Sequence, residues 1–320
     1  MTVNSKNILT VTLNPAIDKN IYIEDFKKGT DSRVSAPIQN VGGKGINVSR
    51  ILNKLGVNNI AIGFIGRLND KFILENLDRE GIRNDFIKTN GLTRTSLTIL
   101  DDKTKNNRIT RILEPGPLVN KNNIIDFVKK YEFYLKKSQY VVISGRIIPG
   151  VSLDFYSKLI RIADRYKIKT IFDASGPEYL LGLLKTSPFM IKPNLTECEK
   201  ICGYKIKQKN HLIKAMHDFH KKGIKIAAIT QGSRGAVVSD GNIILQALPP
   251  KIETKSPVGC GDTFIAYFLW AVLKNKSFHE CVKYAVAGGS LNAMYINPEQ
   301  ITTTRITRLY SKILIKRLNT

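Results

Sequence analysis

Short apolar runs alternate with longer amphipathic segments along this chain, and this rhythm restricts the fold more than any other feature. The runs end at glycine or at polar residues and occupy positions 8–14, 59–66, 140–145, 170–176, 189–194 and 226–232. Segments with helical periodicity lie between them, at 46–56, 155–167 and 211–223. Strands buried on both faces are continuously apolar, and helices connect them. The order therefore predicts an α/β fold, with a mostly parallel sheet covered by helices on both faces.

Two segments, 19–37 and 94–116, break this rhythm and look like antiparallel strands with turns. The second is typical of a hairpin, with DDKTKNN (101–107) as its turn. Two β excursions from an α/β core predict a small sheet laid over the site as a lid. The basic C-terminal stretch, 302–320, is expected to be helical.

The size and composition are those of a globular protein. The 320 residues suffice for one large domain or two small ones, and 42% of them are hydrophobic. No apolar run reaches the roughly 18 residues of a membrane span, and the N-terminus lacks the layout of a signal peptide. A cytoplasmic protein is therefore expected. Four cysteines form neither a disulfide framework nor a zinc-type spacing.

The formal net charge of +24 fits nucleic acid, a membrane surface or anionic metabolites as partners. The lysines are spread along the whole chain, however, and they accompany many asparagines and isoleucines. This favours biased composition over a nucleic-acid surface. An anionic substrate would still benefit from the positive field.

Ligands of open α/β sheets bind at the carboxyl ends of the strands, where glycine-rich motifs occur in this chain. In VGCGDT (258–263), Gly259, Cys260 and Gly261 precede an apolar helical run, and such a helix start favours an anion. Asp262 is either a base beside that anion or simply the cap of the helix. A helix N-terminus is also expected to lower the pKa of Asp262, which weakens it as a base.

A second glycine cluster opens the segment VGGKGINVSRILNKLG (41–56). Gly42 and Gly43 allow close backbone approach, Lys44 supplies a positive donor, and Asn47 lies one turn into the helix, where it can bond a hydroxyl. The alternative is a glycine-rich loop with a solvated lysine.

Two further strand ends carry polar residues. In KPNLTE (192–197), Lys192 ends a strand, and Asn194 and Glu197 offer oxygen ligands that suit hydrated Mg²⁺. The same pair also fits an ordinary capping arrangement. TQGSRGA (230–236) is either a turn against a nucleotide or the turn of a hairpin.

In their order along the chain, these motifs resemble those of the PfkB-type sugar kinases of the ribokinase-like superfamily. The resemblance is greatest to the phosphosugar branch, which comprises minor-type 6-phosphofructokinase, 1-phosphofructokinase and tagatose-6-phosphate kinase. It rests on TLNPAID (12–18), GGKGINVSRIL (42–52), GFIG (63–66), TRTS (93–96), ILEPGP (112–117), SGRIIPGV (144–151), KPNLTE (192–197), TQGSRGA (230–236) and VGCGDT (258–263).

The resemblance implies a single ribokinase-like domain over residues 1–320, built as a three-layer sandwich with a small β-sheet lid. It also implies ATP-dependent phosphorylation of a ketohexose monophosphate to a bisphosphate, in glycolysis or sugar catabolism. The acceptor would be that of a 6-phosphofructokinase or 1-phosphofructokinase, or alternatively that of a tagatose-6-phosphate kinase. A homodimer formed through the lid is expected as well.

The resemblance also assigns roles. Asp262 matches the catalytic base, and Gly259, Cys260 and Gly261 match the anion hole for the γ-phosphoryl group. Asn194 and Glu197 match residues that hold Mg²⁺ through water. The ATP side matches Lys192, Thr230, Gly232 and Gly235. The sugar hydroxyls match Asp18, Gly42, Gly43, Lys44 and Asn47, and the phosphate of the substrate matches Arg94, joined by Arg33 from the lid.

One departure bears on the substrate. In SGRIIPG (144–150), Arg146 replaces a serine that the family uses for the phosphosugar. An arginine there either strengthens phosphate binding or fills the pocket. Two other hypotheses remain open: a kinase for an uncharged sugar or nucleoside, and a degenerate paralogue that binds sugar phosphate or nucleic acid without catalysis. Arg94 argues against the first, and the retained Asp262, Asn194, Glu197 and Lys44 argue against the second.

Overall fold

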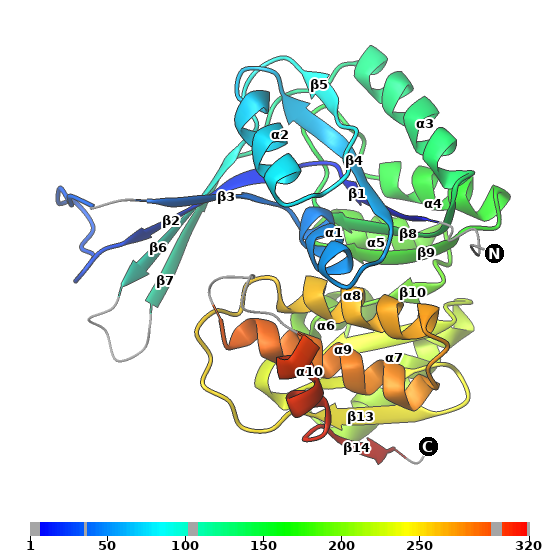
Figure 1. Cartoon of the computed structure of the whole chain (residues 1–320). Helices are drawn as coiled ribbons and strands as arrows, with labels where there is room; N and C mark the ends of the chain where they lie inside the picture. The colour runs from blue at the N-terminus through cyan, green and yellow to red at the C-terminus, as the bar shows by residue number, and fades with distance from the viewer. Residues whose placement is uncertain (1–6, 35–36, 102–107, 296–302, 319–320) are drawn as a thin grey trace.

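The computed structural model describes residues 7–34, 37–101, 108–295 and 303–318. Two sheets, of ten and of four strands, organise them (Figure 1). The strands are β1 (Asn7–Thr12), β2 (Ala16–Tyr22), β3 (Ile38–Gly42), β4 (Asn59–Gly66), β5 (Ile87–Thr89), β6 (Thr95–Asp101), β7 (Arg108–Leu113), β8 (Ser138–Gly145), β9 (Lys169–Ala174), β10 (Met190–Ile191), β11 (Ile226–Thr230), β12 (Ala236–Ser239), β13 (Ile244–Leu248) and β14 (Leu314–Arg317). The helices are α1 (Lys44–Lys54), α2 (Asp70–Arg79), α3 (Lys121–Leu135), α4 (Phe155–Arg165), α5 (Pro177–Leu184), α6 (Leu195–Cys202), α7 (Lys209–Lys221), α8 (Cys260–Leu273), α9 (Phe278–Ala293) and α10 (Thr303–Tyr310).

The larger sheet has the order β14-β13-β12-β11-β10-β9-β8-β1-β4-β5. Seven of its strands run parallel, namely β11, β10, β9, β8, β1, β4 and β5. Strands β12, β13 and β14 add an antiparallel edge. The predicted mostly parallel sheet is therefore confirmed. Because neighbouring parallel strands end at the same side, the loops that follow them converge on one edge.

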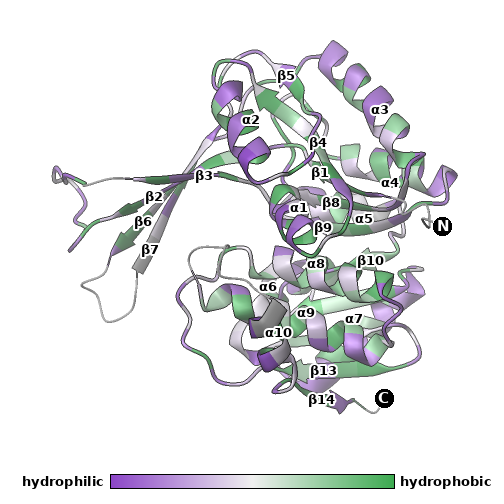
Figure 2. Ribbon diagram, viewed as in Figure 1, coloured by the Kyte–Doolittle hydropathy of each residue, from purple (hydrophilic) through white to green (hydrophobic). Residues whose placement is uncertain are grey.

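The larger sheet is buried on both faces, as its continuous apolar strands predict. Ile8 and Val142 pack with residues of α1, α8 and α9, whereas their neighbours Leu9 and Val141 pack with residues of α3, α4 and α7. Successive side chains of a strand point to opposite faces, so the two cores lie on either side of the sheet. The result is three layers. Figure 2 shows helix α3 striped with hydrophobic and hydrophilic residues, as a covering helix requires.

The smaller sheet has the order β3-β2-β6-β7 and projects from the body as the expected second sheet (Figure 1). The predicted boundary at 19–37 is wrong in detail. Strand β2 begins earlier, at Ala16, and its antiparallel partner β3 lies beyond the boundary, at Ile38–Gly42. The sequence of β3, IQNVG, carries little strand signal of its own, and pairing with β2 stabilises it. The second excursion does form an antiparallel pair, β6 and β7, although turn residues 102–107 lie outside the described residues.

Two other expectations need correction. The run 189–194 contributes only the short strand Met190–Ile191, because Pro193 cannot donate a ladder hydrogen bond. The C-terminal stretch is helical only from Thr303 to Tyr310. Leu314–Arg317 instead pairs antiparallel with β13, which supplies backbone partners that a continued helix would not use.

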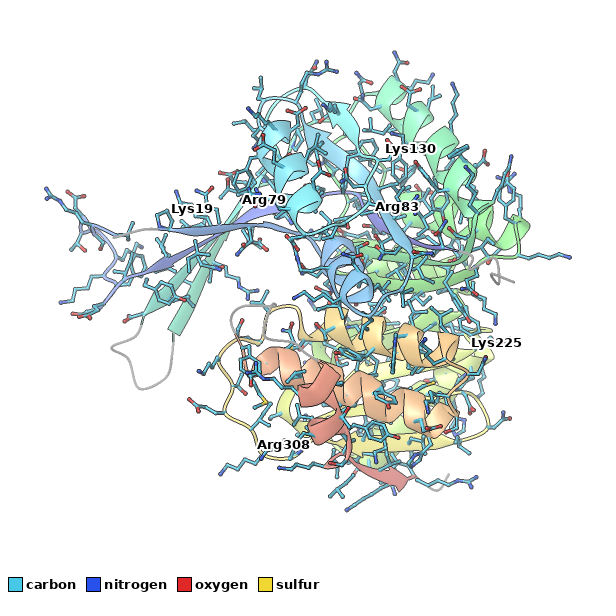
Figure 3. All side chains as sticks on the ribbon, in the orientation of Figure 1. Lys19, Arg79, Arg83, Lys130, Lys225 and Arg308 are labelled. Carbon is cyan, nitrogen blue, oxygen red and sulfur yellow. The ribbon has the colours of Figure 1, made fainter. Side chains whose placement is uncertain are left out.

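The basic side chains are scattered over the molecule, as their spread along the sequence suggests. Figure 3 labels six that lie on the smaller sheet, on both halves of the body and near its C-terminal end: Lys19, Arg79, Arg83, Lys130, Lys225 and Arg308. Within the described ranges, no helix is both long and apolar enough to cross a membrane.

Candidate active site

A cleft of about 1580 Å³ opens where the carboxyl ends of the parallel strands face the smaller sheet. Every predicted site residue lines it except Gly42 and Arg33. Gly42 lies beneath the lining, where an added Cβ atom would overlap the carboxylate of Asp18. Arg33 belongs to the exposed stretch between β2 and β3 and does not reach the cleft within this chain. The sequence motifs therefore converge in space, with Arg33 as the exception.

The N-terminus of α8 points into this cleft. Its N-cap is Gly259, in the left-handed conformation with φ of 79°, and Asp262 makes no capping bond to the helix. The first helical bond runs from the N–H of Thr263 to the oxygen of Gly259, at 2.9 Å. The N–H groups of the residues in between therefore have no intrahelical acceptor. Such a helix end attracts anions, and the capping interpretation of Asp262 is wrong.

Asp262 lies at the floor of the cleft and is only 5% exposed. Its Oδ2 accepts a 2.8 Å hydrogen bond from the side-chain amide of Asn47 in α1. Burial raises the pKa of Asp262 to about 6, although the Lys44 ammonium and the Asn47 bond act to lower it. The expected lowering of this pKa by the helix end is thus outweighed by desolvation. A carboxyl with this pKa is ionised at neutral pH and can still accept a proton.

Asp173, at the end of β9, holds the two lysines of the site. Its Oδ1 lies 3.3 Å from Nζ of Lys44 and 3.2 Å from Nζ of Lys192. Burial alone would lower the pKa of Lys44, but the carboxylates of Asp173, Asp262 and Glu197 together raise it. Lys44 therefore remains charged, and it is not the solvated lysine of the alternative interpretation. Sequence reasoning missed Asp173, although the polar end of the apolar run 170–176 marked its position.

The glycine at position 261 makes room for one of these lysines. A Cβ atom added to Gly261 would lie 2.8 Å from Nζ of Lys192. The side chain of Lys192 is 5% exposed and crosses beneath the first turn of α8. The lysine and the helix end thus direct positive charge to the same part of the cleft.

Asn194 and Glu197 form a capping box at the start of α6. Oδ1 of Asn194 accepts from the N–H of Glu197, and Oε2 of Glu197 accepts from the N–H of Asn194, both at 2.9 Å. Oε1 of Glu197 takes no part in the box. Over the part of the chain that the structure describes, no three His, Cys, Asp or Glu residues gather in a metal-binding group. Carboxylate and amide oxygens such as these are the donor type that hydrated Mg²⁺ takes in proteins.

A second network of charged side chains extends from the smaller sheet. Asp18 in β2 has a pKa raised by burial, while its bond to Ser96 and the charges of Arg94, Arg50 and Arg111 act to lower it. The carboxylate of Asp18 therefore lies among several guanidinium groups, one of which, Arg50, comes from α1.

Arg50, in α1, is a residue that sequence reasoning missed. It donates to Oδ1 of Asn47 at 2.7 Å and to the carbonyl of Val41 at 2.6 Å, and it forms an ion pair with Glu80. These bonds fix the amide of Asn47 with its nitrogen toward Asp262. Arg50 is 8% exposed. Its role depends on this buried packing, which the sequence of the helix alone does not show.

Asn292, in α9, is another residue that was missed. Its Nδ2 donates to the carbonyl of Val258 at 2.6 Å, and its Oδ1 accepts from the hydroxyl of Thr263 at 3.0 Å. The side chain therefore ties the loop before α8 to the first turn of that helix. It also approaches Sγ of Cys260, at 3.6 Å, so the cysteine packs into this support.

The segment 230–236 is the turn of a hairpin and also lines the cleft. Strands β11 and β12 pair antiparallel on either side of a short 3₁₀ turn at Gly232–Arg234. Thr230, Gly232 and Gly235 face the cleft together with Val286 and Ser290 of α9. The two interpretations of this motif are therefore compatible.

Comparison with known proteins gives a consistent result. The sequence model described as "pfkB family carbohydrate kinase" matches residues 11–303. A tagatose-6-phosphate kinase of Staphylococcus epidermidis is 31% identical over 310 residues, which cover 96% of this chain and 98% of the relative. A possible 1-phosphofructokinase of Thermotoga maritima superposes with a TM-score of 0.89 at 28% identity, covering 98% and 99% of the two chains. The tetrameric inhibited form of phosphofructokinase-2 of Escherichia coli superposes with a TM-score of 0.87 at 25% identity, covering 95% and 98%. These matches confirm the resemblance inferred from the motifs.

Proposed function

Because the chain belongs to the pfkB family of carbohydrate kinases, and is therefore an ATP-dependent sugar kinase, we propose that it phosphorylates a ketohexose monophosphate to a bisphosphate. The candidate acceptors are fructose 6-phosphate, fructose 1-phosphate and tagatose 6-phosphate. The relative from Staphylococcus epidermidis supports the last of these. The whole chain would form one kinase domain, and the four-stranded sheet would be its lid.

One observation carries this proposal: the buried carboxylate of Asp262 lies in the first turn of α8, beside the anion-attracting end of that helix. In the proposed reaction, Asp262 takes the proton of the sugar hydroxyl. The hydroxyl oxygen attacks the γ-phosphorus of ATP, the bond to the β–γ bridging oxygen breaks, and ADP leaves. The N–H groups of Cys260 and Gly261 bind the oxygens of the transferred group.

Charge neutralisation falls to Lys44 and Lys192 in this proposal. Oδ1 of Asp173 pairs with both ammonium groups. The two lysine side chains are therefore already in place before the substrate binds. Phosphoryl transfer depends mainly on such positioning and charge. We assign Asp18, Gly42, Gly43, Lys44 and Asn47 to the sugar hydroxyls, since they line or support the cleft.

Mg²⁺ is expected to accompany ATP. Asn194 and Glu197 would hold it through water, and Oε1 of Glu197 is the oxygen that the capping box leaves available. When bound, the ion neutralises part of the charge of the phosphates. We place the nucleotide against Lys192, Thr230, Gly232 and Gly235, with its adenine ring between the 230–236 turn and α9.

We also propose a homodimer in the cytoplasm, formed through the lid. Large apolar side chains are exposed on the lid segments: Tyr22, Phe26, Val34, Ile38, Ile112 and Leu113. Such a concentration of apolar surface on a projecting sheet favours association with a second copy. Arg33, on the same projection, would then lie close to the partner rather than to its own cleft.

An acceptor panel tests the reaction. ATP-dependent ADP release is measured with fructose 6-phosphate, fructose 1-phosphate, tagatose 6-phosphate, fructose and ribose. Turnover of at least one phosphosugar in preference to both neutral sugars is expected. Turnover of neutral sugars alone would refute the proposed acceptor class. Silence on all five, with salt-sensitive binding to heparin, would favour a binding protein without catalysis.

A further inference from the structure

Arg146, directly after β8, stands at the sugar end of the cleft with half of its guanidinium anchored. Its side chain is 58% exposed and lines the cleft, and its Nε donates to Oε1 of Glu178 at 3.3 Å. Glu178 lies in the first turn of α5 and is only 2% exposed. The inner edge of the guanidinium is therefore fixed, while the rest of the group faces solvent.

Glu178 is built into the protein to serve this loop. Its Oε1 also accepts from the N–H of Ile147 at 3.2 Å, and its Oε2 is buried with no hydrogen-bond partner among the described residues. A buried carboxylate is costly without a counter-charge, and Arg146 supplies one. The pair thus differs from a solvated surface ion pair, since one partner is fully enclosed.

Asn14 links this loop to the arginine that the family resemblance assigns to phosphate. The backbone oxygen of Asn14 accepts from Nε of Arg94 at 3.3 Å, and its Nδ2 donates to the carbonyl of Ile147 at 3.2 Å. Arg94 and Arg146 are thereby attached to one support. Both arginines line the same cleft. Burial lowers the pKa of Arg94, and the positive charge of Arg146 acts in the same direction.

Two guanidinium groups that face one cleft repel each other until an anion lies between them. A phosphate dianion accepts paired hydrogen bonds from guanidinium groups and neutralises both charges. We propose that Arg146 is a specificity-determining residue that binds, together with Arg94, the phosphate group already present on the sugar substrate, with Glu178 as its positioning residue. This inference rests on the proposed function. Neutral sugars offer no anion to these two groups and are rejected for that reason.

Steady-state kinetics of Arg146→Ala test the inference on the full-length protein. Charge-assisted hydrogen bonds of this kind make the expected rise in KM for the phosphosugar roughly 10-fold to 100-fold. KM for ATP is expected to change less than about two-fold, since Arg146 lies at the sugar end. Arg161→Ala removes an exposed arginine of α4 and serves as the matched control, with both constants unchanged. An Arg146→Ala enzyme with unaltered or lowered KM for the phosphosugar overturns the inference and indicates that the arginine fills the pocket.

Two further variants separate binding from folding. Arg146→Lys keeps the charge and is expected to recover part of the affinity. The double variant Arg146→Ser with Glu178→Gln leaves no buried unpaired charge, so it should fold and still show the raised KM. Glu178→Gln alone should raise KM for the phosphosugar by a smaller factor, with kcat retained.

Direct binding distinguishes a failure of this inference from a failure of the proposed function. Calorimetry with fructose 6-phosphate, fructose 1-phosphate and tagatose 6-phosphate is compared for the wild type and Arg146→Ala. Arg146-dependent binding without turnover refutes the kinase proposal and supports phosphate binding by Arg146. Turnover with binding that is independent of Arg146 does the reverse, and absence of both turnover and binding refutes both.

Discussion

The side-chain amide of Asn47 in α1 donates a 2.8 Å hydrogen bond to Oδ2 of Asp262 in α8, across 215 positions of sequence. Arg50 holds the other end of that amide at 2.7 Å. The orientation of the proposed base is therefore set by a different helix from the one that carries it. A chain of this kind pre-orders the carboxylate before substrate binds.

Replacing Asn47 by alanine should shift the pH dependence of the enzyme. A base works in its ionised form, so kcat/KM for the sugar should fall as pH drops through the pKa of Asp262, at about 6. The Asn47 bond stabilises the charged form, and its loss therefore raises this pKa. We expect the acidic limb of the Asn47→Ala profile to lie at higher pH than that of the wild type. Coincident limbs would show that the hydrogen bond does not act on the titrating group.

Asp262→Asn tests the base directly. The amide keeps the shape of the side chain and an oxygen that can accept from Asn47, but it cannot take a proton. A positioned base contributes a factor of roughly 10²–10⁴ in rate, so kcat should fall by at least about 10²-fold. ATP should still bind, as measured by calorimetry, because Lys44, Lys192 and the N–H groups at the start of α8 are retained. Near-normal turnover in this variant would remove Asp262 from the proposed role.

Much of the site could be predicted because its parts are local in sequence. The helix start at Cys260, the glycines before α1 and the polar ends of strands each follow from spacing and turn chemistry. What no local pattern contains is their mutual support. Asp173 joins two lysines from distant segments, and Asn292 ties a loop to a helix that begins 32 residues before it at Cys260.

The missed features of the fold have a similar cause. Strand β3 has a weak strand sequence and exists because β2 pairs with it, and β14 exists because β13 offers an edge. Tertiary pairing overrides local propensity in both places. The pKa of Asp262 is raised rather than lowered because the side chain is buried. This burial depends on tertiary packing around the helix end, which the sequence of the helix does not show.

Asp173→Asn should destabilise the protein strongly. The carboxylate of Asp173 is 1% exposed and pairs with Lys192, which is 5% exposed, as well as with Lys44. Removing one partner of a buried pair leaves uncompensated charge and costs about 3–5 kcal/mol in the free energy of unfolding. Urea denaturation at neutral pH measures this loss. Glu75→Gln is the matched control, because Glu75 pairs with Lys71 on the surface and should change stability by less than about 1 kcal/mol.

Arg94→Ala should separate the sugar from the nucleotide. Arg94 is held by the backbone carbonyls of Asn14 and Glu114, which leaves part of its guanidinium for a ligand at the lid end of the cleft. We expect KM for the phosphosugar to rise roughly 10-fold to 100-fold, with KM for ATP nearly constant. An equal rise in KM for the phosphosugar and for ATP would argue against phosphate binding by Arg94 and for general damage to the cleft.

Ile112→Lys should weaken the proposed lid dimer. Ile112 lies in β7 and is 54% exposed, so a charge there disturbs the monomer little. In a two-fold dimer the substitution acts twice, and each buried isoleucine contributes about 1.5–3 kcal/mol. The dimer dissociation constant, measured by analytical ultracentrifugation, should therefore rise at least about 100-fold. Leu153→Lys, at a position that is 52% exposed and outside the lid, should leave it unchanged. Equal effects of the two substitutions, or a wild-type protein that is monomeric at micromolar concentration, would exclude the lid as the dimer interface.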